Sequence, residues 1–119
     1  MTGTTPWEIE YFETPSGRVP VLEWIEQMTP KERAPALLHI EQLALLGTEA
    51  RPPLVKSLGG KLYELRWKAR DKQHRIAYVA AVGRRFVLLH GFIKKSRTTS
   101  REDLELARNR MREYERSTG

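Results

Sequence analysis

The sequence contains no cysteine, which excludes disulfide bonds and thiolate chemistry and favours a cytosolic location over a secreted one. No apolar run approaches the roughly 18 residues that a transmembrane helix needs, so no membrane span is expected. The first residues lack a basic segment followed by an apolar stretch, and no secretory signal peptide is expected. No linker rich in Pro, Gly or Ser separates two apolar cores. We therefore expect a single domain over residues 1–119.

Acidic residues are scarce in the second half of the chain. Between residues 51 and 100 the only acids are Glu64 and Asp71, so an acidic cluster that holds two catalytic metal ions is not expected there. The histidines lie far apart, without Asp or Cys at ligand spacing. The patterns of a nucleophile elbow and of a phosphate-binding P-loop are also missing. We therefore expect neither a metal ion nor a cofactor.

Basic residues are in excess, and they are concentrated in one half of the sequence. Residues 1–50 contain three Lys/Arg and eight Asp/Glu, whereas residues 51–119 contain 18 and seven. The two halves therefore carry net charges of −5 and +11, which make up the overall charge of +6 at pH 7. This asymmetry favours a polyanionic partner, with nucleic acid ahead of anionic lipid.

The periodicity of the apolar residues predicts mixed α and β structure. Alternation predicts strands at residues 7–12, 61–68, 74–82 and 84–94. Helical spacing, with a capping box at Thr29, predicts helices at about 20–28, 30–46 and 100–115. Residues 47–60 are expected to form a connector. The predicted fold is α+β: a small antiparallel sheet in the order β-α-α-β-β-β-α, with a helical hairpin on one face and the last helix at an edge.

Two arginines stand out because they lie within apolar strands. Arg66 and Arg75 fall on neighbouring predicted strands, where an arginine needs a partner, either an acid or a phosphate. Lys94 and Lys95 end the last strand, and aromatic residues are interleaved with these cations. Such a sheet can neutralise an RNA backbone and stack splayed bases. Most of the aromatic residues also fit a hydrophobic core, and the arginines of the last helix fit a solvated face.

Three segments of the sequence form a distinctive combination: LGGKLYELR at residues 58–66, HRIAY at 74–78 and LHGFIKK at 89–95. Together they resemble the phage-derived Gp49-like, HigB-type toxins of the RelE/ParE superfamily. The first predicted strand and residues 20–25 also look like the start of that family, so the resemblance covers nearly the whole chain. It implies a RelE-like fold and the toxin component of a type II toxin–antitoxin system.

The resemblance further implies a ribosome-dependent mRNA endonuclease that works without a metal ion. In such toxins the 2′-hydroxyl attacks the adjacent phosphate and leaves a cyclic phosphate and a 5′-hydroxyl. The implied partners are mRNA on the ribosome and a cognate antitoxin with a helix-turn-helix domain. Operator DNA is expected to bind only through the complex of toxin and antitoxin, and no membrane partner is expected.

The resemblance also assigns catalytic roles to the cations of the sheet. Arg75 matches the Tyr-Arg strand position of the family, although His74 precedes it here, and would brace the phosphate with two hydrogen bonds. Arg66 matches the arginine of the ELR segment. Lys94 and Lys95 match the paired cations that end the last strand, where one would donate a proton to the leaving oxygen or hold the phosphate. The candidates for further RNA contacts are Lys56, Lys61, Lys68 and Arg97.

The general base is left open by the sequence. The better-known RelE branch has lysines on the first strand of the meander, where this chain has Leu62 and Glu64. It also has a tyrosine shortly after the paired cations, where this chain has Arg97, Thr98 and Thr99. Glu64 is one candidate, because it shares strand parity with Arg66. His90 is another, since its intrinsic pKa suits proton transfer near neutral pH. A lysine whose pKa is lowered by neighbouring cations is the third.

Two other functions are compatible with the same residues. One is a non-catalytic nucleic-acid-binding or regulatory module, in which Arg66 and Arg75 contribute only affinity. The other is a catalytically inactive member of the family whose main role is to bind its partner. Inhibition of growth and cleavage of transcripts distinguish these two from an active endonuclease.

Overall fold

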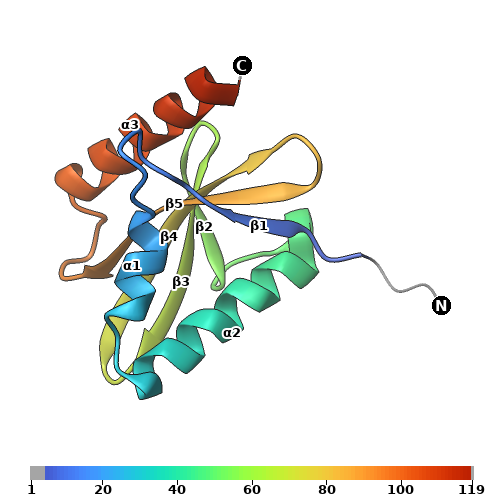
Figure 1. The fold of residues 1–119 in the computed structure, drawn as a ribbon. Helices are drawn as coiled ribbons and strands as arrows, with labels where there is room; N and C mark the ends of the chain where they lie inside the picture. Colours follow the sequence, from blue (N-terminus) through green and yellow to red (C-terminus); the bar gives the residue numbers. More distant parts are fainter. Residues whose placement is uncertain (1–4, 119) are drawn as a thin grey trace.

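The computed structural model describes residues 5–118, and it confirms the predicted α+β class (Figure 1). Residues 1–4 and 119, which belong to the expected 1–119 domain, lie outside the described residues. The elements in chain order are β1 (Glu8–Tyr11), α1 (Pro20–Glu26), α2 (Pro30–Leu46), a short 3-10 turn (Gly47–Glu49), β2 (Val55–Gly59), β3 (Leu62–Ala69), β4 (Lys72–Ala81), β5 (Arg85–Lys94) and α3 (Arg101–Thr118).

The sheet has five strands in the order β1-β5-β4-β3-β2. Strands β3 to β5 form the predicted antiparallel meander, and β2 extends it by pairing antiparallel with β3. β1 pairs in parallel with β5, with Glu8 opposite Arg85 and Tyr11 opposite Leu88. The sheet is therefore mixed rather than wholly antiparallel. The direction of β1 depends on the path of the chain through the two helices, which local periodicity does not reveal.

Strand β2 lies within the segment that the sequence predicted as a connector. It pairs with β3 from Val55 opposite Leu65 to Gly59 opposite Leu62, with an irregularity near the glycine. Only Val55 of its five residues is buried, and the strand stands at the edge of the sheet. An edge strand this short, with few apolar residues, carries too weak an alternation to be recognised from sequence.

The two faces of the sheet carry separate hydrophobic cores, one for each helical layer. Helices α1 and α2 cover one face, where Val21 and Ile40 belong to the same apolar cluster as Leu65. Helix α3 packs on the other face, where Ala107 joins a second cluster that includes Val87. The last helix therefore covers a face rather than an edge, contrary to the prediction. Because β4 and β5 are covered on both faces, they appear in the sequence as nearly continuous apolar runs.

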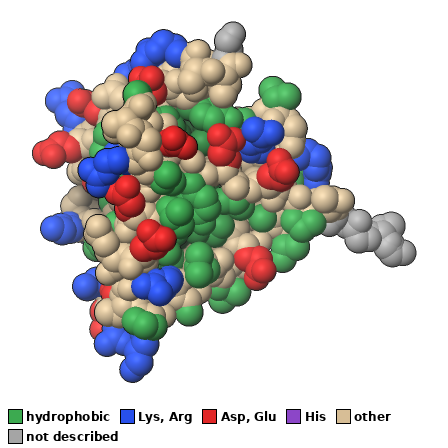
Figure 2. Space-filling model, viewed as in Figure 1, with side chains coloured by type: hydrophobic (Ala, Val, Ile, Leu, Met, Phe, Trp, Pro, Cys, Tyr) green, Lys and Arg blue, Asp and Glu red, His purple; other side chains and the backbone are tan. Residues whose placement is uncertain are grey.

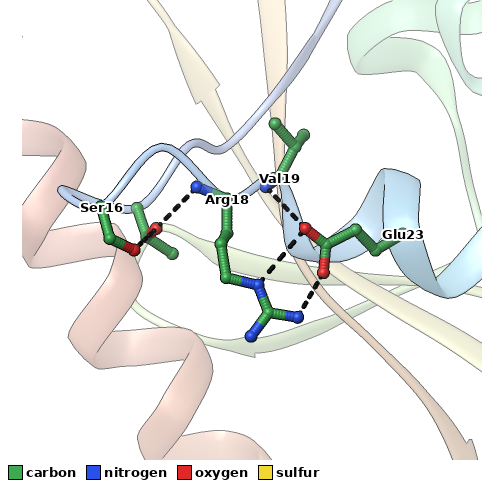
Figure 3. Close-up of polar contacts among 5 residues, drawn as sticks. Ser16, Arg18, Val19 and Glu23 are labelled. Atoms are coloured by element: carbon green, nitrogen blue, oxygen red, sulfur yellow. Dashed lines mark hydrogen bonds and ion pairs between the residues drawn. The ribbon is translucent and has the colours of Figure 1, made fainter.

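The helices of the hairpin begin where polar side chains bind their free N–H groups. At the start of α2, the Thr29 hydroxyl accepts from the Glu32 N–H, and the Glu32 carboxylate accepts from the Thr29 N–H, which confirms the predicted capping box. At the start of α1, the Glu23 carboxylate lies between the Arg18 guanidinium and the Val19 N–H (Figure 3). These contacts fix the angle at which the chain enters each helix.

Two further features set the geometry of the sheet. Arg70 and Asp71, at the β3–β4 turn, both have positive φ angles (53° and 63°), as in the tight hairpin turns that match the twist of a sheet. Gly91 on β5 lies directly against the indole of Trp24, and a Cβ atom at this position would come within 2.3 Å of the ring. None of the helices within residues 5–118 is long and apolar enough to cross a membrane.

Candidate active site

Arg66 and Arg75 lie side by side on the sheet face that carries α3. They are directly opposite each other in the antiparallel pairing of β3 and β4. Because side chains alternate along a strand, Glu64 of β3 shares this face. Lys94 of β5 also belongs to it, since it lies opposite Gln73 of β4. Three cations and one carboxylate from three strands therefore meet on one surface.

A buried carboxylate joins the two arginines. The Glu64 side chain is fully buried, and its Oε1 is 3.3 Å from Nε of Arg75 and 3.7 Å from Nε of Arg66. Its Oε2 accepts a 2.7 Å hydrogen bond from the hydroxyl of Thr99, in the loop between β5 and α3. A carboxylate without water needs such charged and polar partners. Glu64 therefore connects β3, β4 and this loop.

Arg75 is held in one orientation by neighbours on its own strand. Its Nη1 donates to the backbone carbonyl of His74 at 2.8 Å, and its Nη2 donates to Oε1 of Gln73 at 3.2 Å. Burial lowers the pKa of Arg75 from its ordinary value, and the charge of Glu64 opposes this shift. The guanidinium nonetheless stays protonated. Within residues 5–118, one hydrogen on each terminal nitrogen has no protein acceptor, and this pair suits a phosphate bound in a bidentate manner.

Arg66 and Lys94 are the more accessible cations of the cluster. The Arg66 side chain is 27% exposed, against 4% for Arg75. The pKa of Lys94 is lowered from its ordinary value, first by burial and then by the positive charges of Arg75, Arg66 and Lys56, while Glu64 partly offsets the effect. A lysine with a lowered pKa gives up its proton more readily near neutral pH.

The other predicted RNA-binding residues are distributed unevenly around this cluster. Lys56 is opposite Glu64 on β2, and its charge acts on Lys94, so it borders the cluster. Lys68 continues the Arg66 face of β3 and is exposed. Lys61 instead lies beside the β2–β3 turn, where it pairs with Glu115 of α3 at 3.5 Å. The structure therefore places Lys61 apart from the arginines.

Lys95 and Arg97 lie in the exposed segment that follows β5. Lys95 and Lys94 line a hollow of about 580 Å³, together with Ser100 and Asp103 at the start of α3. Lys95 is one residue beyond the strand, so its position alternates with that of Lys94. The cluster with the two arginines therefore includes Lys94 rather than Lys95.

His90 connects β5 to the start of α3. Its Nε2 lies 2.7 Å from Oδ1 of Asp103, whose Oδ2 accepts a hydrogen bond from the Ser100 hydroxyl. The His90 ring also stacks on Phe92. Burial lowers the pKa of His90 more than the hydrogen bond to Asp103 raises it. This contact joins β5 to the first turn of α3, and Nε2 of His90 is engaged by Asp103.

Thr99 and Gln73 contact the cluster but were not identified from the sequence. Thr99 is 35 residues from its partner Glu64, so no local spacing indicates the contact. Gln73 could have been found, because it is two residues before Arg75 and therefore shares its face of the strand. In residues 5–118, no group of three or more His, Asp or Glu side chains is placed to hold a metal ion.

The arginines of α3 have a different role. Arg108 donates to the backbone carbonyl of Leu58 at 3.1 Å, and Arg110 donates to that of Leu89 at 2.8 Å, so both anchor the helix to strands. On the side of the molecule formed by α1, α2 and β1, Figure 2 shows hydrophobic side chains at the centre with acidic side chains around them. The acidic half of the sequence, which contains these three elements, thus contributes one side of the molecule.

The mixed sheet with a helical hairpin on one face and a third helix on the other is compatible with the small RelE-like fold. A sequence model of the phage-derived Gp49-like proteins matches residues 23–112. The chain belongs to this family, which is a family of RelE/HigB-like toxins, and the predicted resemblance is confirmed. The matched range contains every residue of the cluster. No curated protein matches the chain. Membership of this family points to the toxin of a toxin–antitoxin system.

Proposed function

We propose that the protein is the toxin of a type II toxin–antitoxin system and acts as an endoribonuclease that cleaves mRNA on the ribosome without a metal ion. The observation that carries this proposal is the cluster of Arg66, Arg75 and Lys94 around the buried Glu64. Cations fixed in a partly buried site stabilise charge that develops on a phosphate, and they need no reorganisation during the reaction.

The proposed reaction is an in-line attack of the 2′-hydroxyl on the adjacent phosphorus. The 2′-hydroxyl gives up its proton to water, a bond forms between the 2′-oxygen and phosphorus, and the bond from phosphorus to the 5′-oxygen breaks. The products are a 2′,3′-cyclic phosphate and a 5′-hydroxyl. Arg75 and Arg66 stabilise the charge of the pentacoordinate phosphate, and Lys94 donates a proton to the departing 5′-oxygen. The lowered pKa of Lys94 suits it to this step.

Glu64 is proposed as a positioning residue rather than the general base. Both of its oxygens already face partners, and its side chain has no exposed surface. The ribosome would align the 2′-hydroxyl with the phosphate, and alignment of this kind can lower a barrier by about 7–11 kcal/mol at the extreme. We therefore expect free RNA to be cut slowly.

The proposed partners follow from the same role. A cognate antitoxin with a helix-turn-helix domain would neutralise the toxin, and operator DNA would be bound only through their complex. The toxin would act in the cytoplasm, where translated mRNA is found. The support for these partners is membership of the toxin family.

The proposal is tested by expressing the protein without an antitoxin. The wild type is expected to stop growth and cleave transcripts, and Arg75→Ala to abolish both while still binding ribosomes. Arg112→Ala is the matched control, because Arg112 is exposed on α3 and bonds only to Asn109 among the described residues. Normal growth and intact transcripts with soluble wild-type protein would contradict the proposal. RNA binding that weakens in Arg75→Ala, without cleavage by the wild type, would favour the non-catalytic module.

A further inference from the structure

A hollow of about 410 Å³ opens at the free edge of β3, next to the two arginines. The pairing of β2 with β3 ends at Val55 and Leu65, so the last residues of β3 have no strand on that side. Arg66, Arg75 and Gln73 line the hollow from one side of the sheet, and Trp67 and His39 line it from the other. The site therefore combines guanidinium groups with aromatic rings.

The aromatic wall is a rigid stack. Trp67 lies between His39 and His74, with centroid distances of 5.4 and 5.3 Å and interplanar angles of 14° and 12°. Nδ1 of His39 is 2.7 Å from the carbonyl of Pro35, which fixes the ring on α2. Because a carbonyl can only accept, this nitrogen carries the proton. His39 is the partly exposed end of the stack, whereas His74 and Trp67 are buried.

The same wall contains a buried donor without an acceptor. Trp67 is 5% exposed, and its indole N–H has no hydrogen-bond partner among the described residues. Nε of Arg66 and Nε of Arg75 are also buried, and they face Oε1 of Glu64 at 3.7 and 3.3 Å. Buried indole N–H groups usually have a partner. The lining groups that open into the hollow are the partly exposed side chains of Arg66 and His39 and the exposed side chain of Gln73.

We propose that this hollow binds a nucleobase of the RNA whose phosphate lies on Arg66 and Arg75. The base would lie against the partly exposed His39 ring at the end of the stack, and acceptors on its edge would bind the Gln73 amide. The hollow is within the range of small-molecule sites, about 300–1,000 Å³. This inference rests on the proposed function and deepens it, because a base site beside the phosphate would select the nucleotide at the cleavage position.

The test measures the binding of small probes to the full-length protein. The four ribonucleoside 3′-monophosphates and inorganic phosphate are titrated, and the Trp67 indole resonance is followed by NMR after assignment with Trp67→Phe. At least one nucleotide is expected to bind about tenfold more tightly than phosphate, as stacking on an aromatic ring predicts. His39→Ala should remove this advantage without changing the affinity for phosphate. Gln42→Ala, an exposed change on the same helix, should keep it.

The outcomes separate this inference from the proposed function. Equal affinities for phosphate and all four nucleotides would overturn the base site, as would an unchanged advantage in His39→Ala. Cleavage of mRNA by the wild type is scored in a separate assay. Selective nucleotide binding by a protein that cuts no mRNA would retain the base site and overturn the endonuclease. Cleavage without any nucleotide preference in binding would overturn the base site alone.

Discussion

The hydroxyl of Thr99 donates a 2.7 Å hydrogen bond to Oε2 of Glu64, and this contact joins the loop after β5 to the centre of the sheet. The other oxygen of the same carboxylate lies 3.3 Å from Nε of Arg75. One buried group therefore fixes both the loop and the guanidinium that we propose to hold the phosphate. Changes at Glu64 and Thr99 should act on the reaction through the orientation of Arg75.

Glu64→Gln is expected to lower kcat on ribosome-bound mRNA by about 10²-fold, because Arg75 loses its charged neighbour and its orientation changes. A small displacement of a positioned group can lower a rate by about this factor. KM should change little. The shape of the pH–rate profile should stay the same, since Glu64 does not transfer a proton. Disappearance of the acidic limb of that profile in Glu64→Gln would instead identify Glu64 as the general base.

Thr99→Val removes the hydroxyl while keeping the shape of the side chain. The buried Glu64 oxygen then lacks its hydrogen bond, and the free energy of unfolding should fall by about 1–3 kcal/mol in urea denaturation. Thr99→Ser should retain most of the stability. Thr98→Val, an exposed change in the same loop, is the control. Equal stability of Thr99→Val and Thr98→Val would mean that the contact contributes nothing.

The pH dependence of cleavage should report on Lys94. Burial, reinforced by Arg75, lowers the pKa of Lys94 below its ordinary value of 10.5. A general acid must be protonated, so the rate should fall as pH rises through this lowered pKa. Lys94→Arg should remove the fall, because arginine keeps its proton in this range, and should also reduce the rate. Lys31→Arg, on α2, should leave the profile unchanged. An alkaline limb that persists in Lys94→Arg would assign the proton to another group.

Gly91→Ala is expected to destabilise the protein by about 1–3 kcal/mol, because its Cβ would meet the Trp24 ring at 2.3 Å. The stability is measured by thermal or urea unfolding. Trp24→Leu removes the colliding atoms, so Gly91→Ala should cost much less in that background. Additive effects of the two changes would show that the packing of Gly91 on Trp24 is not the cause.

The fold class and the arginine pair could be predicted from sequence because both have local signals. The Thr29 capping box, the helical spacing and the alternation in β3 to β5 are properties of neighbouring residues. Arg66 and Arg75 were recognisable as cations within apolar strands. The register of β3 and β4 places them directly opposite each other.

The features that sequence did not reveal depend on contacts between distant segments. The parallel pairing of β1 with β5 joins residues about 77 apart, and no local pattern specifies its direction. Glu64 can be buried because Thr99 and Arg75, both distant in sequence, supply partners for its carboxylate. Helix α3 covers a face of the sheet because that face is apolar as well. The His39–Trp67 stack arises only once α2 packs on β3.

The central claim is that the cluster around Arg75 cleaves mRNA on the ribosome. The most direct measurement programs purified ribosomes with a defined mRNA, adds wild-type protein or Arg75→Ala, and analyses the RNA ends. Fragments with 2′,3′-cyclic phosphate and 5′-hydroxyl ends are expected for the wild type, and none for Arg75→Ala. Intact mRNA with ribosome-bound wild-type protein, or equal cleavage by the two proteins, would contradict the claim.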